Sequence, residues 1–282
     1  MSRIQEILKK AEREGSVHRT RPYAAEGPAV GSPSAAAAAT VPMPPMPPLQ
    51  TPSPRTVDVS LDRRLVAAFS PQSLAAEQYR SLRTRVKSAE HGRPMRAIII
   101  TSPNKGDGKS LSAANLALTM AQEFQQRVLL VDADLRRPTI HSLFGITETP
   151  GLSDVLRGGA SLDDALVAIP HHALTVLPSG PIPSHPAELL GSTGMRRLLE
   201  TLRTRFDRIL IDMPPVAPLA DVSIALGMVD GLLMIVRAGV TPKPAIERAL
   251  SGLDLSKVLG LVLNDAGTGS ASYGYGDDYV AG

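Results

Sequence analysis

Short hydrophobic runs recur between residues 96 and 265, and stretches with helical spacing separate them. Each run is rich in Val, Ile and Leu, which is typical of strands that are covered on both faces of a parallel sheet. The pattern therefore predicts an α/β fold with a mostly parallel β-sheet flanked by helices. The predicted strands are RAIIITS (96–102), RVLLVDAD (127–134), ALTVLPSG (173–180), DRILIDMPP (207–215), DGLLMIVRAG (230–239) and VLGLVLND (258–265).

The two ends of the chain lack this pattern. Ile4, Ile7 and Leu8 fall at helical spacing near the N-terminus. Ten prolines follow between Pro22 and Pro54, which is typical of an extended linker. The predicted order is a short amphipathic helix in residues 1–20, a disordered Pro/Ala-rich linker in residues 21–56, a folded domain in residues 57–266 that opens with a helix near Ser73, and a flexible tail in residues 267–282.

Composition removes several function classes. The chain has no cysteine, so disulfides, thiolate–zinc sites, cysteine-ligated iron–sulfur clusters and cysteine nucleophiles are excluded. This composition fits a reducing cytosol. No hydrophobic stretch approaches the roughly 18 residues of a membrane-spanning helix, so we expect a soluble, cytoplasmic protein.

The net charge of +3 lies in the N-terminal part. Residues 1–64 carry nine Lys or Arg and six Asp or Glu, and the remaining residues carry 21 of each. A neutral folded part without tryptophan offers little attraction for a phosphate backbone. We therefore expect no nucleic-acid partner.

The segment IIITSPNKGDGKSLSAANLA contains the most informative motif. A predicted strand runs into a loop with Gly106, Gly108, Lys109 and Ser110, and a predicted helix follows. This is the context of a P-loop, in which backbone N–H groups and the helix N-terminus hold phosphates. The strict pattern is not complete, because Pro103 occupies the first glycine position. The predicted nucleotide-binding residues of the loop are Lys105, Gly106, Asp107, Gly108, Lys109, Ser110 and Leu111.

Three carboxylates follow predicted strands. Asp132 and Asp134 end one strand and Asp212 ends another, at the sheet edge where ligands bind in open α/β folds. Beside a phosphate loop they predict an ATP site with Mg²⁺. Lys109 would contact the β- and γ-phosphates and the Ser110 hydroxyl would bind the metal.

These motifs resemble those of the bacterial tyrosine kinases of capsule and exopolysaccharide systems, relatives of the MinD/ParA-type ATPases. The resemblance covers about residues 65–282. It rests on GDGKS, VLLVDADLRRP, ILIDMPP, GLSDVL, LPSGPIPSHPAELL and a tyrosine-rich C-terminus.

The resemblance implies an ATP-dependent protein-tyrosine autokinase that regulates polysaccharide polymerisation and export. Its phosphoacceptors would be Tyr273, Tyr275 and Tyr279, which a neighbouring copy would phosphorylate. A phenol has a pKa near 10 and needs a proton acceptor. Asp132 or Asp134 would take this role, with Asp132 favoured, and the remaining carboxylate would join Asp212 in the metal shell.

The resemblance also implies partners. EQYRSLR matches the family's ring-forming pattern through Glu77, Arg80 and Arg83. A transmembrane polysaccharide co-polymerase would anchor and activate the kinase at the inner face of the membrane, and other proteins would be further substrates. Asn264 matches the position at which relatives contact adenine, although a turn-forming asparagine is an alternative.

One departure keeps a second hypothesis open. The signature lysine of the MinD/ParA relatives is replaced by Asn104, and Lys105 follows one place later. The main alternative is a spatial-regulator ATPase without kinase activity, which would release free phosphate and leave the tyrosines unmodified. A non-catalytic interaction module is a third reading, and the intact Lys109 and Ser110 argue against it.

Overall fold

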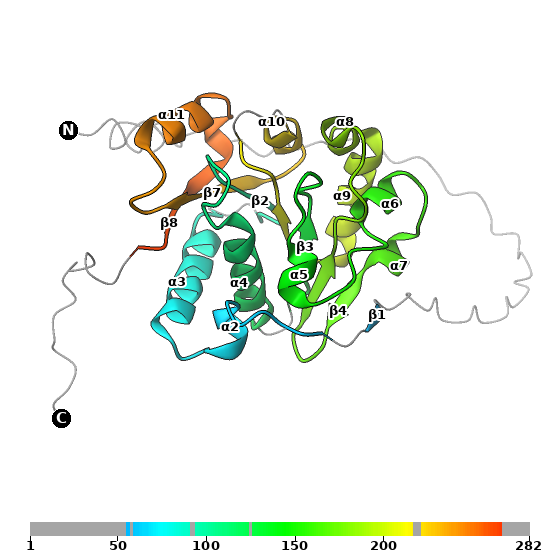
Figure 1. Ribbon diagram of the computed structural model, residues 1–282, viewed down its shortest axis with the longest axis horizontal. Helices are drawn as coiled ribbons and strands as arrows, with labels where there is room; N and C mark the ends of the chain where they lie inside the picture. The colour runs from blue at the N-terminus through cyan, green and yellow to red at the C-terminus, as the bar shows by residue number, and fades with distance from the viewer. Residues whose placement is uncertain (1–54, 57–58, 91–93, 124–125, 217–220, 267–282) are drawn as a thin grey trace, which may run out of the picture. The chain divides into compact units, whose positions relative to one another are not determined.

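The computed structural model describes residues 55–56, 59–90, 94–123, 126–216 and 221–266 (Figure 1). The predicted N-terminal helix, nearly all of the predicted linker and the predicted tail lie outside these residues. Within them, no helix is long and apolar enough to span a bilayer.

An eight-stranded sheet forms the centre of the described domain. Its spatial order is β1-β4-β5-β3-β6-β2-β7-β8. The strands are β1 (Arg55–Thr56), β2 (Ala97–Thr101), β3 (Val128–Asp132), β4 (Val167–Ile169), β5 (Leu174–Leu177), β6 (Arg208–Asp212), β7 (Gly231–Arg237) and β8 (Val258–Asn264). The six predicted strands are β2, β3, β5, β6, β7 and β8, and all of the pairings among these six are parallel. The predicted mostly parallel sheet is therefore confirmed.

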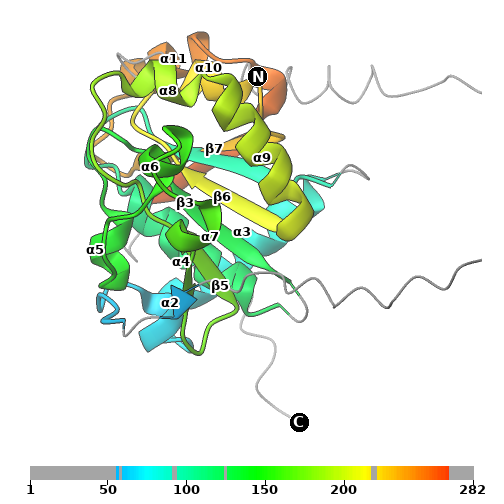
Figure 2. The same cartoon turned by 90° about the vertical axis from the view of Figure 1, so that its right-hand side faces the viewer.

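Helices cover both faces of the sheet (Figure 1; Figure 2). They are α2 (Val66–Phe69), α3 (Leu74–Ser88), α4 (Lys109–Ala121), α5 (Ile140–Phe144), α6 (Leu152–Leu156), α7 (Leu162–Ala165), α8 (Pro186–Leu190), α9 (Thr193–Arg205), α10 (Asp221–Leu226) and α11 (Lys243–Ser251), with a 3₁₀ turn η1 (Leu255–Lys257). The helix expected near Ser73 is α3, and the Ser73 hydroxyl caps it by accepting from the Ala76 N–H.

Two hydrophobic cores lie on opposite faces of the sheet. Successive side chains of a strand point to opposite faces, so Ile99 of β2 joins the core under α9, whereas Ile98 and Ile100 join the core under α4. Both faces of β2, β3 and β6 are buried along their full length. This double burial explains why these strands contain runs of Ile, Leu and Val.

The outer strands differ from the predicted pattern. β4 pairs with β5 in the antiparallel direction, and its three residues are too few to give a strand signal. β8 is at the sheet edge, where Leu261 and Leu263 are 50% and 62% exposed. The prediction of burial on both faces is therefore wrong for β8, which is the last strand of the sheet among the described residues.

The strand order brings the predicted site residues together. β6 lies between β2 and β3, so the segments that follow these three strands emerge side by side at the carboxyl edge of the sheet. These are the segments that carry the predicted phosphate loop and the three aspartates.

Candidate active site

The loop between β2 and α4, residues 102–108, is called the phosphate loop below. Its two glycines have left-handed backbones, with φ of +87° at Gly106 and +92° at Gly108, a conformation that other residues rarely adopt. Gly108 is also crowded, because a Cβ there would lie 2.1 Å from Nδ2 of Asn264. α4 begins at the next residue, so its unpaired N–H groups are available for phosphate oxygens.

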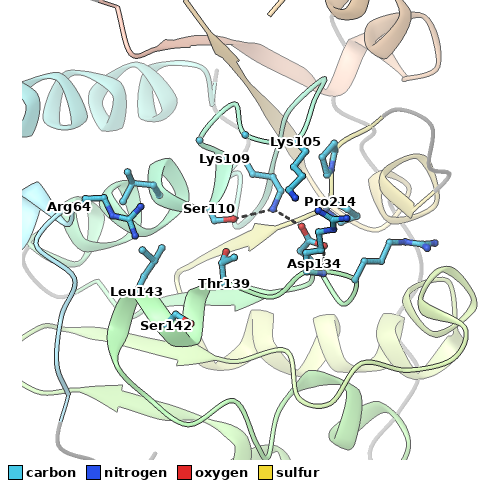
Figure 3. Close-up of a pocket in the computed structure, with 15 residues that line it drawn as sticks. Arg64, Lys105, Lys109, Ser110, Asp134, Thr139, Ser142, Leu143 and Pro214 are labelled. Carbon is cyan, nitrogen blue, oxygen red and sulfur yellow. Dashed lines mark hydrogen bonds and ion pairs between the residues drawn. The ribbon is translucent and has the colours of Figure 1, made fainter. Parts of the chain in front are cut away.

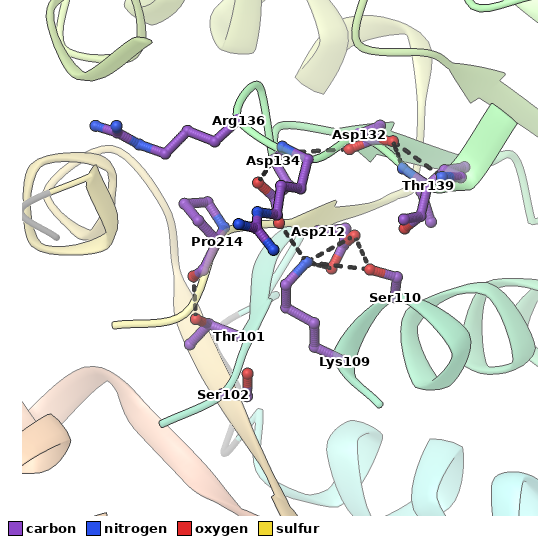
Figure 4. A network of polar contacts seen from close by, with 12 residues as sticks. Thr101, Ser102, Lys109, Ser110, Asp132, Asp134, Arg136, Thr139, Asp212 and Pro214 are labelled. Atoms are coloured by element: carbon purple, nitrogen blue, oxygen red, sulfur yellow. Dashed lines mark hydrogen bonds and ion pairs between the residues drawn. The ribbon is translucent and has the colours of Figure 1, made fainter. Parts of the chain in front are cut away.

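The Lys109 ammonium lies among the predicted carboxylates (Figure 4). Its Nζ is 2.8 Å from Oδ2 of Asp134 and 3.3 Å from both carboxylate oxygens of Asp212. The Ser110 hydroxyl donates to Oδ2 of Asp212 at 2.5 Å. The structure thus brings together four residues that are separated by up to 103 positions in the sequence.

Asp132 lies directly beside Asp212, because the two are register partners on β3 and β6. Both side chains are fully buried. Burial and the negative charge of Asp212 raise the pKa of Asp132 to about 8. Burial likewise raises the pKa of Asp212, although Lys109 and Ser110 act in the opposite direction. Burial alone would lower the pKa of Lys109, but Asp212 and Asp134 raise it, so the ammonium stays charged.

The Asp132 carboxylate also shapes the segment that follows β3. Its Oδ2 accepts from the backbone N–H groups of Thr139 and Ile140, each at 3.0 Å, and its Oδ1 accepts from the N–H of Asp134 at 3.2 Å. Both oxygens are therefore engaged by the backbone. In this arrangement Asp132 holds Asp134 and the start of α5 in place.

The phosphate loop is fixed from behind by a second polar network. Asp107 is buried, and its carboxylate accepts from the Asn104 N–H at 2.9 Å and from the Thr241 hydroxyl at 2.7 Å. The side-chain amide of Asn264 donates to the Asp107 carbonyl at 2.9 Å. Asn264 therefore braces the loop backbone here, and its predicted contact with adenine stays a prediction.

A cavity of about 600 Å³ lies in front of the phosphate loop (Figure 3). Figure 3 shows Arg64 and Leu143 at one end of it, Lys109 and Ser110 in the middle, and Asp134 with Pro214 beyond them. The predicted residues that line this cavity are Lys105, Gly106, Gly108, Lys109, Ser110, Leu111 and Asp134. The predicted residues Asp107, Asp132, Asp212 and Asn264 do not line it but contact residues that do.

Several residues of the site were not among the sequence predictions: Arg64, Arg136 and Arg137, which line the cavity, and Thr241, which lies behind the phosphate loop. Arg136 and Arg137 occur in the motif VLLVDADLRRP, so a closer reading of that motif had a signal for them. Arg64 and Thr241 had none, because they reach the site from distant segments.

The helix residues of the predicted ring interface have partners within the chain. Arg80 pairs with Glu77 at 2.6 Å on the exposed side of α3. Arg83 donates to the Thr119 carbonyl of α4 at 2.8 Å and lies 3.6 Å from Glu123. The predicted role of these three residues between subunits stays a prediction. The predicted phosphoacceptors Tyr273, Tyr275 and Tyr279 lie outside the described residues.

Comparisons with known proteins agree with this geometry. The family AAA_31, described as an AAA domain, matches residues 95–252. The tyrosine-protein kinase YwqD of Bacillus subtilis is 40% identical over 218 residues, which cover 76% of this chain and 92% of that protein.

Two further relatives support the same assignment. The tyrosine-protein kinase CpsD of Streptococcus agalactiae is 33% identical over 205 residues, which cover 71% of this chain and 88% of that protein. The solved kinase domain of the Escherichia coli tyrosine kinase ETK superposes with a TM-score of 0.67 at 30% identity, and the match covers 75% of this chain and 84% of that one.

The resemblance drawn from the motifs is thereby confirmed, and the reading as an ATPase without kinase activity gives way to it. The phosphate loop, the lysine among the strand-end carboxylates and the matched relatives lead to one assignment. The chain belongs to the bacterial tyrosine kinases of the MinD/ParA-type P-loop family, and it is a nucleotide-binding protein-tyrosine kinase.

Proposed function

We propose that the kinase transfers the γ-phosphoryl group of ATP to Tyr273, Tyr275 and Tyr279 of a second copy of the chain. The observation that carries this proposal is the position of Lys109, 2.8 Å from Asp134 in the cavity in front of the phosphate loop. A cation, a carboxylate that lines the cavity and a phosphate-binding backbone are groups that phosphoryl transfer to a hydroxyl requires.

Lys109 changes partners during the reaction in this proposal. Without nucleotide its ammonium is held by Asp134 and Asp212. The β- and γ-phosphates of ATP compete for the same ammonium, because they carry more negative charge than the two carboxylates. When Lys109 moves to the phosphates, the Asp134 carboxylate loses its ion pair and becomes free to accept a proton.

The tyrosine O–H proton moves to an Asp134 carboxylate oxygen, the phenolic oxygen forms a bond to the γ-phosphorus, and the bond from that phosphorus to the bridging oxygen of ADP breaks. The sequence favoured Asp132 as the proton acceptor. We favour Asp134, because it lines the cavity, whereas both oxygens of the buried Asp132 already accept backbone N–H groups.

The oxygen donors around Ser110 fit a magnesium ion. The Ser110 hydroxyl contacts Asp212, so these two residues would hold the ion, with Asp132, the register neighbour of Asp212, as the nearest further carboxylate. Mg²⁺ takes one or two carboxylates and completes its shell with phosphates and water. When bound, the ion supplies charge neutralisation on the transferred group.

The cellular role follows from the family. We propose that copies assemble into a homo-oligomeric ring through Glu77, Arg80 and Arg83, exchanging the partners that these residues have within one chain. A transmembrane polysaccharide co-polymerase recruits the ring to the inner face of the membrane and activates it, and other proteins are further substrates. Each phosphotyrosine adds about −1.5 to −2 charges, which ends docking of the tail and loosens the ring. The cycle regulates capsule or exopolysaccharide polymerisation and export.

The test incubates the purified full chain with ATP and Mg²⁺ at high protein concentration and maps phosphate by mass spectrometry. We expect phosphate on the three tail tyrosines and none in a Lys109→Met variant. A mixture of the Lys109→Met chain with a catalytically intact chain whose three tail tyrosines are phenylalanine tests transfer between copies. Release of free phosphate with no modified tyrosine in either sample would overturn the proposal.

A further inference from the structure

The lining of the cavity in front of the phosphate loop is strongly cationic. Five basic residues line it, and Asp134 is the single acidic residue among the described residues that does so; the basic set is Arg64, Lys105, Lys109, Arg136 and Arg137. The lining of the cavity therefore carries more basic than acidic side chains.

Three of the five cations have partners. Arg64 pairs with Asp62 at 2.8 Å and Lys109 with Asp134 at 2.8 Å. Arg136 pairs with the buried Asp221, also at 2.8 Å. The side chains of Lys105 and Arg137 are exposed, and neither has an ion pair within the described ranges.

These two cations belong to different parts of the site. Lys105 lies on the phosphate loop, so the phosphates of ATP account for it. Arg137 follows β3, and its backbone N–H donates to Oδ1 of Asp134 at 3.1 Å. Arg137 is therefore fixed beside the carboxylate that we assign as the proton acceptor, where a phenol must approach.

The tail of the chain carries the complementary charge. Asp277 and Asp278 immediately precede Tyr279, whereas Tyr273 and Tyr275 are flanked by Ser and Gly. An extended chain advances about 3.5 Å per residue, so a carboxylate one or two residues before the acceptor lies within about 7 Å of it. An arginine fork binds such a carboxylate through two hydrogen bonds.

Building on the proposed function, we propose that Arg137 recognises the acidic residues beside the acceptor, and that it makes Tyr279 of a second copy the preferred first phosphorylation site. Without a cation here, Asp277 and Asp278 would approach a site that already holds three carboxylates and the charge of ATP. Arg137 offsets that repulsion most for Tyr279, which Asp277 and Asp278 directly precede. Tyr275 gains less, because Asp277 follows it by two residues, and Tyr273 gains least, because its nearest acidic residue is four positions away.

The experiment separates the enzyme copy from the acceptor copy. The acceptor is the full chain with Lys109→Met, and the enzyme is the full chain with its three tail tyrosines changed to phenylalanine. Initial phosphorylation rates are measured for each acceptor tyrosine by mass spectrometry. We expect Tyr279 to react first with the unmodified pair. Arg137→Gln in the enzyme should lower kcat/KM for Tyr279 about tenfold through KM, with the KM for ATP unchanged.

A charge exchange sharpens the test. Arg137→Glu in the enzyme should nearly abolish Tyr279 phosphorylation, and Asp277→Lys with Asp278→Lys in the acceptor should restore it. Arg248→Gln is the matched control, because Arg248 is an exposed arginine of α11 that does not line the cavity. Melting temperatures of all variants verify folding.

Three results would overturn the inference. In the first, Asp277→Asn with Asp278→Asn leaves the Tyr279 rate unchanged. In the second, Arg137→Gln slows all three tyrosines equally and raises the KM for ATP, which would assign Arg137 to the nucleotide. In the third, no tail tyrosine reacts in the unmodified pair, and the proposed function then fails together with the inference that rests on it.

Discussion

The two ends of the sheet use the same residue types in different ways. At the amino ends of the strands, each acid has a base of its own: Arg203 pairs with Asp230 at 2.7 Å, Arg127 with Asp207 at 3.1 Å, and Arg208 with Glu90. At the carboxyl ends, Asp134 and Asp212 both pair with Lys109, and Asp132 lies beside Asp212 without an ion pair of its own among the described side chains.

The difference separates charge that stabilises the fold from charge that serves the reaction. The pKa of Asp207 and that of Asp230 are both lowered, with hydrogen bonds from Arg127 and Arg203 as the main stabilising contacts. The pKa of Asp132 and that of Asp212 are raised, chiefly by burial. An excess of buried negative charge is unfavourable for folding, and such excess is typical of catalytic sites.

The largest effect is expected at the carboxyl end. Asp134→Asn removes the proton acceptor and should lower the rate of tyrosine phosphorylation about 10²–10⁴-fold, the range for a general base. ATP binding, measured by titration of a fluorescent nucleotide, should persist because Lys109 and the loop remain. Phosphorylation at the parent rate by the variant would move the proton-acceptor role to Asp132.

The next effect concerns stability and pH. The pKa of Asp132 in the folded protein, about 8, lies above its ordinary value of 3.8. Between these values the folded state holds a proton that the unfolded state has lost, so the stability contributed by this group falls as pH rises from about 4 to 8. Asp132→Asn should flatten this dependence, measured as the free energy of unfolding without nucleotide between about pH 4 and pH 8.

Asp230→Asn is a control for which the expected change in the pH dependence of stability has the opposite sign. Because the pKa of Asp230 is lowered, its contribution is present above the ordinary pKa and is lost as pH falls through the folded value. This variant should lose stability at neutral pH and little at strongly acidic pH. If both variants changed the pH profile in the same direction, the contrast between the two ends of the sheet would be mistaken.

A smaller effect is expected from Arg203→Gln at the amino end. Arg203 binds both oxygens of Asp230, at 2.7 and 2.8 Å, and both side chains are about one quarter exposed. The variant should unfold with a free energy lower by about 1 kcal/mol, as measured by urea denaturation. Its kinase activity should equal that of the parent, since the site lies at the other end of the strands.

The smallest effect is expected from Arg127→Gln. The Arg127 side chain is 62% exposed, so water and salt already screen its pair with Asp207. The melting temperature should correspond to a stability change within about 0.5 kcal/mol. A loss of stability as large as that of Arg203→Gln would show that exposure does not decide how much each ion pair contributes to stability.

The sequence predicted what depends on local patterns. Buried runs placed all six long strands, and Asp132 and Asp212 met because each ends such a run on neighbouring strands. Contacts between distant segments could not be predicted, because no local sequence pattern indicates them. The Thr241 hydroxyl reaches Asp107 across 134 positions, and Arg64 reaches the cavity from a segment with no motif.

The exposure of the edge strand β8 could not be predicted from its hydrophobic pattern either. Leu261 and Leu263 have the same character as the buried residues of β7, and only the strand order shows that their strand is outermost. Arg136 and Arg137 are adjacent in one motif and both are exposed, yet Arg136 pairs with the buried Asp221 and Arg137 has no ion pair among the described residues.

The contact between Asn264 and the phosphate loop has a practical consequence. Asn264 ends the outermost strand, 157 positions after the Asp107 carbonyl that it binds, and its amide occupies the space that any side chain at position 108 would need. A shortened protein that stops before β8 would therefore keep every catalytic residue and still lose the support behind its nucleotide cradle. The minimal active fragment has to extend through Asn264.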